Sequence, residues 1–270
     1  PFRALLPRFP FVLGSDVSGV VAAVGGRVQG FREGQEVYAM QPSSRGFGTY
    51  AEFVAVPAAA VASKPSTMSH AEAAGVPLAA LTARQALLED AGLKPGHKVL
   101  IIGASGGVGS YSVQIAKSIG ADVTGVCSTR NLEFVGDLGA DRVIDYKREP
   151  FLDTGDVYDV VFDTIGKENL KRCAFSLTRR GVYVTTIPSL RTLRDSIVSR
   201  LRSSMPGKRR KSRVVLVRSR GAELAELTRL VEEGKLRTHV DRVFPLEEAA
   251  AAHDASRTFR TRGKLVLAVK

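Results

Sequence analysis

The chain has 270 residues, of which 44% are hydrophobic, so it can form one large domain or two of ordinary size, and no stretch reaches the ~18 apolar residues of a membrane-spanning helix. Its two cysteines, Cys127 and Cys173, are too few for a disulfide framework or a four-cysteine zinc site; they fit a reducing compartment, and we expect the cytoplasm. The formal net charge is +12, but without residues 191–220 the chain is only mildly basic.

The first part of the chain is predicted to be β structure. Residues Val17–Val24 are apolar or small, Gly30–Met40 places turn residues around a short apolar run, and Gly48–Pro57 alternates before it breaks at a proline. Glycine and proline are frequent throughout residues 11–61. This density of turn residues is typical of a small β-barrel.

A helical region follows the β structure. Ser69 and Glu72 have the spacing of a capping box and predict a helix start. The pattern from Leu78 to Ala91 continues as helix, and Leu93–Gly96 contains the proline and glycine that end it.

From Lys98 onward, short apolar strands alternate with helices. We predict a helix at Val108–Ile119 and strands at Val99–Ile102, Val123–Cys127, Arg142–Ile144, Val157–Asp163 and Val182–Ile187. Such alternation implies a parallel sheet that is covered on both faces. The chain then closes with helices and strands at Glu223–Glu233, Val240–Phe244, Leu246–Ala255 and Lys264–Val269.

Residues 191–220 hold eleven lysines and arginines and a single acid, Asp195. A solvated loop or lid is the simplest interpretation; contact with phosphate, with an acidic partner or with a membrane surface through 191–213 are alternatives. No aromatic residues stand among these charges to stack on bases, so we expect no nucleic-acid binding. A helical stripe of apolar residues overlaps the segment: Leu190, Leu193, Ile197 and Leu201. The stripe suggests a helix that covers a cleft, contacts a second subunit in a homodimer, or docks on acidic lipid.

A glycine turn, Gly103–Gly109, lies between the first of the alternating strands and its helix. Glycine permits a sharp turn and lets backbone N–H groups approach an anion. The positive end of the helix favours an anion by ~0.3–1 kcal/mol, and Gly109 allows helix and strand to pack closely. In this strand–turn–helix context the pattern indicates a dinucleotide pyrophosphate site; a tight turn without a ligand is the alternative.

The end of the next strand indicates which dinucleotide binds. NAD-specific sites carry Asp or Glu there, ~20 residues after the glycine turn, but this strand ends in Ser128-Thr129-Arg130, and Asp122 lies at its other end. Ser128 can donate to a phosphate oxygen, and Arg130 adds a charge-assisted fork. We therefore expect NADP(H); an ordinary surface role for Arg130 is the alternative.

Taken together, these stretches resemble the medium-chain dehydrogenase/reductase superfamily and its zinc-independent quinone oxidoreductase branch. The matching stretches are Pro10–Gly25, Gly34–Met40, Gly48–Pro57, Ala73–Leu87, Gly103–Ala121, Leu138–Tyr146, Val161–Gly166 and Gly263–Leu267. The resemblance implies an α/β fold: a Rossmann doubly wound parallel sheet at 78–221, and a GroES-like β-barrel domain at 1–77 to which the chain returns at 222–270. It also implies that the N-terminal part of the GroES-like domain is incomplete.

The resemblance and the residues together suggest which positions bind the NADP(H) cofactor. The candidates are Thr82, Ser105, Gly106, Gly107, Val108, Gly109, Ser128, Arg130, Tyr146, Ile165, Thr186, Ile187, Pro188 and Ser189. The glycine turn, Ser128, Arg130 and the strand ends also follow from the residues themselves, because ligands sit at the carboxyl ends of parallel strands. Thr82, expected near the nicotinamide, and Tyr146, expected near the 2′-phosphate, rest on the resemblance.

The implied activity is an NADPH-dependent reduction of a quinone or an α,β-unsaturated carbonyl compound. Zinc-dependent relatives carry Gly-His-Glu where this chain has Gly14-Ser15-Asp16, and the four histidines do not have metal-ligand spacing, so we expect no metal. No catalytic residue is assigned. The alternatives are an enoyl-thioester reductase of fatty-acid or polyketide type, and a low-turnover NADPH-binding scaffold or sensor protein.

Overall fold

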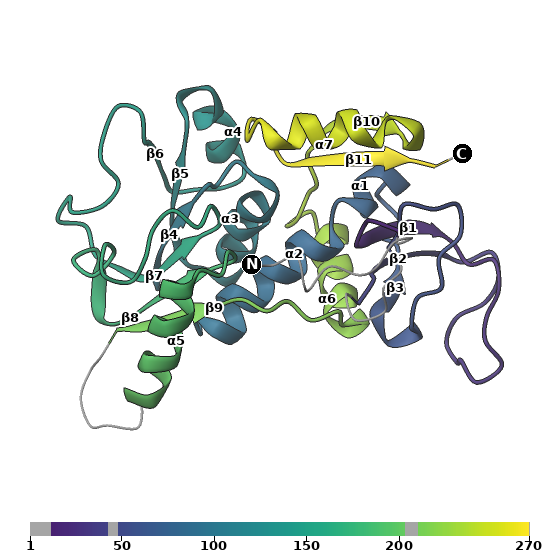
Figure 1. The fold of residues 1–270 in the computed structure, drawn as a ribbon, viewed down its shortest axis with the longest axis horizontal. Helices are drawn as coiled ribbons and strands as arrows, with labels where there is room; N and C mark the ends of the chain where they lie inside the picture. Colours follow the sequence, from purple (N-terminus) through teal and green to yellow (C-terminus); the bar gives the residue numbers. More distant parts are fainter. Residues whose placement is uncertain (1–11, 43–47, 203–209, 270) are drawn as a thin grey trace. The chain divides into compact units, whose positions relative to one another are not determined.

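The computed structural model describes residues 12–42, 48–202 and 210–269, and the chain divides into two compact units (Figure 1). The first unit comprises Pro1–Leu81 and Arg218–Lys270, and the second comprises Thr82–Val217. Both ends of the chain therefore belong to the first unit. Within the described ranges, no helix is long and apolar enough to cross a membrane.

The first unit contains a three-stranded antiparallel sheet in the order β1 (Asp16–Val20), β2 (Glu36–Met40) and β3 (Val61–Ser63). Helix α6 (Gly221–Glu232), from the C-terminal part of the chain, packs against β3. The fully buried Tyr38 of β2 donates its hydroxyl hydrogen to a backbone carbonyl of α6 at 2.7 Å. Burial of this aromatic ring with a satisfied hydroxyl ties two distant parts of the sequence into one core.

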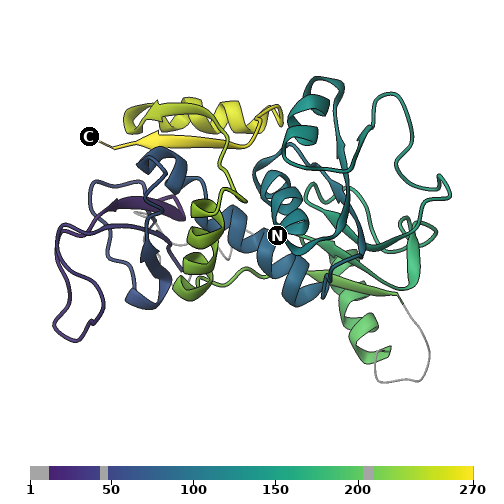
Figure 2. The same ribbon diagram turned by 180° about the vertical axis from the view of Figure 1, so that it is seen from behind.

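A second, two-stranded sheet lies in the same unit. Strands β10 (Val240–Pro245) and β11 (Lys264–Ala268) pair in parallel, and a short 3₁₀ turn, η6 (Leu246–Glu248), leads from β10 into helix α7 (Ala249–Arg257). Helix α7 runs beside β11, as the yellow segments of Figure 2 show. The sequence predicted both strands here within one residue of their observed bounds, and the predicted helix Leu246–Ala255 covers the 3₁₀ turn η6 and most of α7.

The helical region in the middle of the chain begins as predicted. Helix α1 (His70–Ala74) starts with a capping box in which Ser69 and Glu72 bond reciprocally. Helix α2 (Pro77–Arg84) then begins at a proline, whose missing N–H costs nothing at a helix start. The single long helix expected after Leu78 ends differently, because a π-helical turn, η4 (Gln85–Asp90), replaces its last part.

Residues 48–57 form no strand, although they alternate in sequence. Their backbone makes two hydrogen bonds with the preceding segment, from Gly48 N to Val12 O and from Tyr50 N to Leu13 O, both at 2.9 Å. A Cβ atom at Gly48 would lie 2.0 Å from the carbonyl oxygen of Leu13, so the two segments approach too closely for ordinary side chains. The contact ends within three residues, and a short 3₁₀ turn, η3 (Ala58–Ala60), follows Pro57.

The second unit is built on a six-stranded parallel sheet in the order β6-β5-β4-β7-β8-β9. Its strands are β4 (Lys98–Ile102), β5 (Asp122–Cys127), β6 (Arg142–Asp145), β7 (Tyr158–Asp163), β8 (Leu177–Thr185) and β9 (Lys211–Val214). Leu100, Val126, Ile144 and Val161 are all buried in one apolar cluster of this sheet. Continuous apolar strands of this kind stabilise a sheet whose two faces are both covered, so the α/β prediction is confirmed.

In the described parts of the connections between these strands there are four helical segments. Helix α3 (Gly107–Ile119) packs on β4 and β5 and ends at Gly120 in the left-handed conformation. A 3₁₀ turn, η5 (Thr129–Asn131), leads into α4 (Leu132–Asp137), which packs on β6. Helix α5 (Leu190–Arg202) packs on the edge strand β9 (Figure 1).

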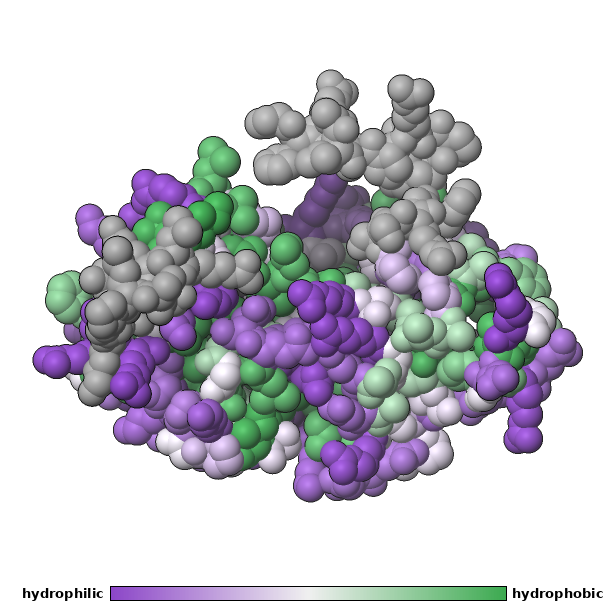
Figure 3. Space-filling model, turned by 90° about the horizontal axis from the view of Figure 1, so that it is seen from below, coloured by the Kyte–Doolittle hydropathy of each residue, from purple (hydrophilic) through white to green (hydrophobic). Residues whose placement is uncertain are grey.

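The described parts of the basic segment, 191–202 and 210–220, contain a helix and a strand in place of the solvated loop that was the simplest interpretation. Strand β9, which the sequence did not predict, buries Ser212 completely against β8, and Ser199 of α5 donates to the carbonyl of Ser212 at 3.1 Å. Helix α5 thus packs its small polar side on the sheet and leaves Leu190 and Ile197 exposed by 90% and 60%. Figure 3 shows hydrophobic residues in green among hydrophilic ones in purple across the face it presents. The proposed cleft, subunit and lipid contacts of this stripe stay predictions, and Leu201 has a side chain outside the described set.

Candidate functional site

One edge of the six-stranded sheet collects nearly all the predicted site residues. The chain runs from β4 through β5 to β6 on one side and then crosses to β7 and β8 on the other. Strands β4 and β7 therefore flank a topological switch point, where parallel sheets bind ligands. The predicted site residues lie in the loops or helix starts directly after β4, β5, β6, β7 and β8: Ser105, Gly106, Gly107, Val108, Gly109, Ser128, Arg130, Tyr146, Ile165, Thr186, Ile187, Pro188 and Ser189.

The glycine turn after β4 is shaped by close backbone approaches. Gly103 has φ +82°, and a Cβ atom there would lie 2.6 Å from side-chain atoms of both Thr164 and Ile165. A Cβ atom at Gly109 would lie 2.1 Å from the carbonyl oxygen of Gly103. At Gly106 the nearest such contact is 3.4 Å, so the middle of the turn stays open. Glycine is therefore required where α3 meets β4, as the sequence predicted.

The start of α3 has the features of an anion site. Gly106 is the N-cap residue, and among the described residues no side chain caps the helix there. The first backbone N–H groups of a helix have no partner within the helix, and the helix dipole adds positive charge at the same end. The N–H groups of Gly107 to Gly109 therefore fit the diphosphate of a dinucleotide, which accepts hydrogen bonds from such groups, whereas the N–H of Gly106 already donates to the carbonyl of Gly103 at 3.0 Å.

The loop after β5 is tied to its neighbours by two side chains. Asn131, buried to 4% exposure, donates from Nδ2 to the hydroxyl of Ser105 at 2.9 Å and to that of Ser128 at 3.5 Å. Thr129 donates its hydroxyl to Asp145 at the end of β6, at 2.6 Å. The glycine turn and the ends of β5 and β6 are thus joined by side-chain hydrogen bonds into one surface.

An acid, Asp145, does stand near this surface, although on β6 rather than at the end of β5. The hydroxyl of Thr129 keeps the pKa of Asp145 below its usual range, with help from the backbone N–H of Lys147 and the charges of Lys147 and Arg148. The carboxylate is 5% exposed and engaged by these groups, whereas Lys147 and Arg148 are exposed. The accessible charge around Ser128 and Tyr146 is therefore positive, which suits a phosphate.

A buried carboxylate fixes the conformation of the loop that follows β7. Asp163, fully buried at the end of β7, accepts hydrogen bonds from the backbone N–H groups of Ile165 at 2.9 Å, Gly166 at 2.8 Å and Glu168 at 2.8 Å, and from the hydroxyl of Tyr183 at 3.0 Å. Tyr183 shares its single hydroxyl hydrogen with the carbonyl of Glu168 at 2.8 Å, so the three backbone N–H groups are the main donors to the buried carboxylate. They also hold the Ile165 side chain against Gly103, so this loop and the glycine turn meet at the switch point.

The loop after β8 joins the same group of residues. Thr186 donates its hydroxyl to the carbonyl of Thr164 at 3.3 Å, and a Cβ atom at Gly166 would lie 2.6 Å from Cβ of Ile187. Ser189 has a different engagement, because it exchanges hydrogen bonds with Thr192 at the start of α5. The Ser189 hydroxyl therefore accepts a hydrogen bond at the start of α5, while Thr186 and Ile187 lie by the switch point.

Thr82 does not belong to the strand edge. It lies in α2, 6% exposed, and its assignment to the nicotinamide still rests on the family resemblance. Tyr50 belongs to the first unit, where its hydroxyl lies 3.4 Å from Nε2 of His253.

The residues around Asp16 do not fit a catalytic zinc ion. Asp16 accepts a hydrogen bond from the backbone N–H of Leu78 at 2.7 Å, and the ammonium of Lys264 lies 3.4 Å from its other oxygen. Burial raises the pKa of Asp16, and the charge of Lys264 opposes that shift. Across residues 12–42, 48–202 and 210–269, no three His, Cys, Asp or Glu side chains gather as a metal site.

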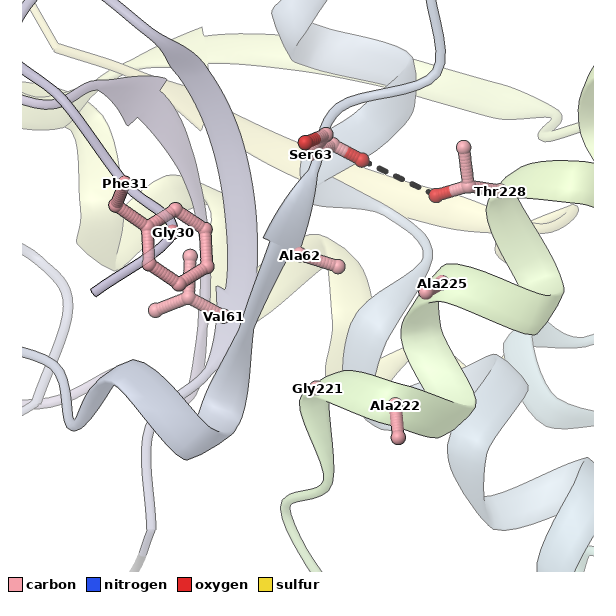
Figure 4. Close-up of a pocket in the computed structure, with 9 residues that line it drawn as sticks. All are labelled: Gly30, Phe31, Val61, Ala62, Ser63, Gly221, Ala222, Ala225 and Thr228. Carbon is pink, nitrogen blue, oxygen red and sulfur yellow. Dashed lines mark hydrogen bonds between the residues drawn. The ribbon is translucent and has the colours of Figure 1, made fainter.

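A separate cavity of about 350 Å³ lies in the first unit, between β3 and the start of α6 (Figure 4). Phe31, Val61, Ala222 and Ala225 give it mostly small, apolar walls. The hydroxyl of Thr228 points to Ser63 and donates to its carbonyl at 3.1 Å, as the dashed line shows. That hydroxyl is already bonded to the protein, so the carboxyl ends of the parallel strands in the second unit are the better candidate site.

Sequence reasoning missed three polar residues of this site. Asp163 and Asp145 each end a strand, and an acid at the carboxyl end of a parallel strand is a signal that could have identified them. Asn131 follows Arg130 directly, but its bond to Ser105 spans 26 positions. No local pattern could have predicted that contact.

Two sequence profiles match the chain. The profile of an alcohol dehydrogenase GroES-like domain matches residues 3–66, and that of a zinc-binding dehydrogenase matches residues 138–267. The first lies in the first unit, which agrees with the predicted GroES-like domain, and the second begins in the second unit, at the end of α4, and continues into the first unit.

Similar proteins align along most of the chain. It is 36% identical over 280 residues to the chloroplastic quinone-oxidoreductase QR1 of Triphysaria versicolor, covering 98% of this chain and 82% of that protein. It is 36% identical over 275 residues to the 2-methylene-furan-3-one reductase of Solanum lycopersicum, covering 98% of this chain and 66% of that protein. The solved quinone oxidoreductase from Coxiella burnetii matches with a TM-score of 0.84 and 34% identity, over 96% of this chain and 79% of that one.

Proposed function

Because the chain belongs to the medium-chain dehydrogenase/reductase family, in its quinone oxidoreductase-like branch, we propose that it reduces a quinone or an α,β-unsaturated carbonyl compound with NADPH. It is an oxidoreductase of the kind that uses a nicotinamide cofactor and a small-molecule substrate. The names of the two relatives, a quinone oxidoreductase and a furanone reductase, support these two acceptor classes. Zinc takes no part in the proposal, because the residues around Asp16 do not fit it.

The uncapped start of α3 at the switch point is the observation that carries the proposal. Bound NADPH would supply the hydride. Gly106 to Gly109 would hold the diphosphate, and Ile165, Thr186 and Ile187, which lie by the switch point, would support the nicotinamide end. The protein's part in the reaction is then to bind, orient and shield the cofactor.

The preference for NADPH over NADH depends on the residues that follow β5 and β6. Ser128, Arg130 and Tyr146 would contact the 2′-phosphate, and Lys147 and Arg148 would add positive charge. Asp145 could repel a phosphate, but its carboxylate is engaged by Thr129 and the backbone N–H of Lys147.

Oxidation of NADPH and NADH with a panel of acceptors tests the function. We expect NADPH oxidation, followed by absorbance, with quinones and enones. Faster turnover of enoyl thioesters would indicate the enoyl reductase alternative, and NADPH binding without oxidation by any acceptor would indicate the scaffold or sensor alternative. Failure to bind either dinucleotide would reject the oxidoreductase assignment for this chain.

The cofactor preference has its own test in Arg130→Ala. Loss of a direct charge-assisted bond should weaken NADPH by about 1–2 kcal/mol, or about 5–30-fold, and leave NADH nearly unchanged. Arg142→Ala is a matched control, because Arg142 begins β6 at the opposite end of the sheet and pairs with Asp156 at 2.8 Å. Equal losses for the two cofactors would remove Arg130 from the 2′-phosphate site. The cytoplasmic location, the homodimer and the membrane contact stay predictions.

A further inference from the structure

Asn131 connects the two places where the cofactor's phosphates would bind. Its side-chain nitrogen donates to Ser105 of the glycine turn at 2.9 Å and to Ser128 at the end of β5 at 3.5 Å. Its side chain is 4% exposed, and its backbone N–H bonds the carbonyl of Ser128 at 2.8 Å. One buried amide group therefore reaches both serines from a closed turn.

The helix that Asn131 begins does not use this side chain. Asn131 is the N-cap residue of α4, and no side chain of the described chain caps that helix start. Asparagine is among the best N-cap residues, because its side-chain oxygen can accept a hydrogen bond from the first turn. Here the side chain turns away from α4 toward Ser105, so the helix forgoes a stabilising contact that the residue could make.

The direction of these hydrogen bonds decides what the serine hydroxyls can do. An amide NH₂ group only donates, so each serine oxygen accepts from Asn131 and keeps its own hydrogen for another partner. Phosphate oxygens only accept. If both hydroxyls instead donated to a neighbouring protein oxygen, they would present lone pairs to the phosphates and repel them.

We infer that Asn131 is a positioning residue that turns the hydroxyls of Ser105 and Ser128 to donate to the diphosphate and to the 2′-phosphate of the cofactor. This inference rests on the proposed NADPH-binding function. Asn131 touches neither phosphate; it acts through the serines. Thr129, bonded to Asp145, holds the same turn from the other side and keeps Asn131 within reach of Ser105.

Binding measured by calorimetry with two probes separates the two serines. NADH carries the diphosphate without a 2′-phosphate, and adenosine 2′-monophosphate carries the 2′-phosphate without either phosphate of the bridge. Asn131→Ala should weaken each probe about 3- to 10-fold, as expected for one misdirected hydrogen bond. Asn131→Asp should weaken both more than tenfold, because its carboxylate accepts from both hydroxyls and adds a like charge. Asn169→Ala is the control, because the side chain of Asn169 accepts a hydrogen bond from Arg172 N within its own turn, at 3.2 Å.

A double-mutant cycle distinguishes positioning from a general effect on the fold. In the Asn131→Ala background, Ser105→Ala should cost NADH binding less than twofold, because the hydroxyl is already misdirected. It should not change binding of adenosine 2′-monophosphate, for which Ser128→Ala gives the corresponding cycle. Thermal unfolding checks that each variant is folded, and the cycle is run with Asn131→Asp if Asn131→Ala does not fold.

Two results would overturn the inference while leaving the proposed function intact. Fully additive losses for Asn131→Ala and Ser105→Ala would show that Asn131 does not act through the serine. Wild-type affinity in Asn131→Asp would show that the direction of the hydrogen bonds is irrelevant. Absence of dinucleotide binding by the wild-type chain is a different outcome, which rejects the proposed function and the inference together.

Discussion

The contact between α3 and the glycine turn gives the sharpest prediction. In Gly109→Ala, the added Cβ atom would lie 2.1 Å from the carbonyl oxygen of Gly103 and 2.8 Å from Cα of Ala104. Both neighbours are backbone atoms, so no side-chain rotation can relieve the overlap. The start of α3 must move away from β4, and the N–H groups that would hold the diphosphate move with it.

The size of the effect follows from two opposing contributions. Overpacking in a tight interior costs about 1–3 kcal/mol, and a rigid backbone neighbour places this case near the upper end. Alanine recovers ~1 kcal/mol through its better helix propensity. The net loss is about 2 kcal/mol, which lowers the unfolding temperature by about 6 °C at ~3 °C per kcal/mol.

The assay is thermal unfolding followed by circular dichroism, with NADPH binding measured on the same samples. Gly136→Ala is the matched control, because Gly136 also lies in a helix but a Cβ atom there meets nothing within 4 Å. It should stabilise the protein by about 0.4–1 kcal/mol. Gly106→Ala, with its nearest contact at 3.4 Å, should fold normally and weaken NADPH by crowding the diphosphate. The reasoning is refuted if Gly109→Ala unfolds at the wild-type temperature and binds NADPH normally.

Three further substitutions test the polar residues that the structure adds to the site. Asp163→Asn places an NH₂ group against backbone N–H donors in a fully buried position. Urea unfolding should therefore show that the free energy of unfolding falls by about 2–4 kcal/mol. Tyr183→Phe, which removes only one hydroxyl donor, should lower it by about 1 kcal/mol. Thr129→Val removes the first cause of the lowered pKa of Asp145, so a carboxyl NMR titration should show that pKa rising toward its ordinary value.

The effect of Thr129→Val on the pKa of Asp145 can also be checked through the pH dependence of stability. A carboxyl group with a lowered pKa in the folded state stabilises the fold above its ordinary pKa, and this stabilisation is lost as the pH falls through the folded value. Thr129→Val should therefore be more destabilising at neutral pH than in acid. An equal loss of stability at neutral and acid pH, or an unchanged pKa of Asp145, would contradict the contact between Thr129 and Asp145. Wild-type stability of Asp163→Asn would contradict the role given to the buried carboxylate of Asp163.

Much of the site could be predicted because its signals are local. The capping box of Ser69 and Glu72 depends on residues three apart, and the glycine turn with its following helix lies within one short stretch. The alternation of apolar strands and helices predicted the parallel sheet, and parallel strands place Ser128, Tyr146, Ile165 and Thr186 at one edge without further information. Whether these residues bind the cofactor stays a prediction.

The expectations that were wrong or incomplete concern contacts between distant segments. Strand β9 is polar and basic in sequence, and it forms because β8 offers backbone partners along its edge. Gly48–Pro57 has an alternating pattern, yet its close approach to Val12 and Leu13 limits pairing to two hydrogen bonds. Backbone partners of this kind leave no trace in the residues of either segment.

The amino-acid sequence by itself determined the class of the sheet, the glycine turn at the start of α3 and the lack of an acid at the end of β5, since backbone conformation and hydrophobic periodicity are properties of neighbouring residues. Only the tertiary structure decided that Asp145 of the next strand is engaged by Thr129, that Asp163 holds the loop of Ile165, and that Asn131 reaches Ser105. These bonds join loops that meet because their strands are adjacent in the sheet, and adjacency in space is decided by how the whole chain packs.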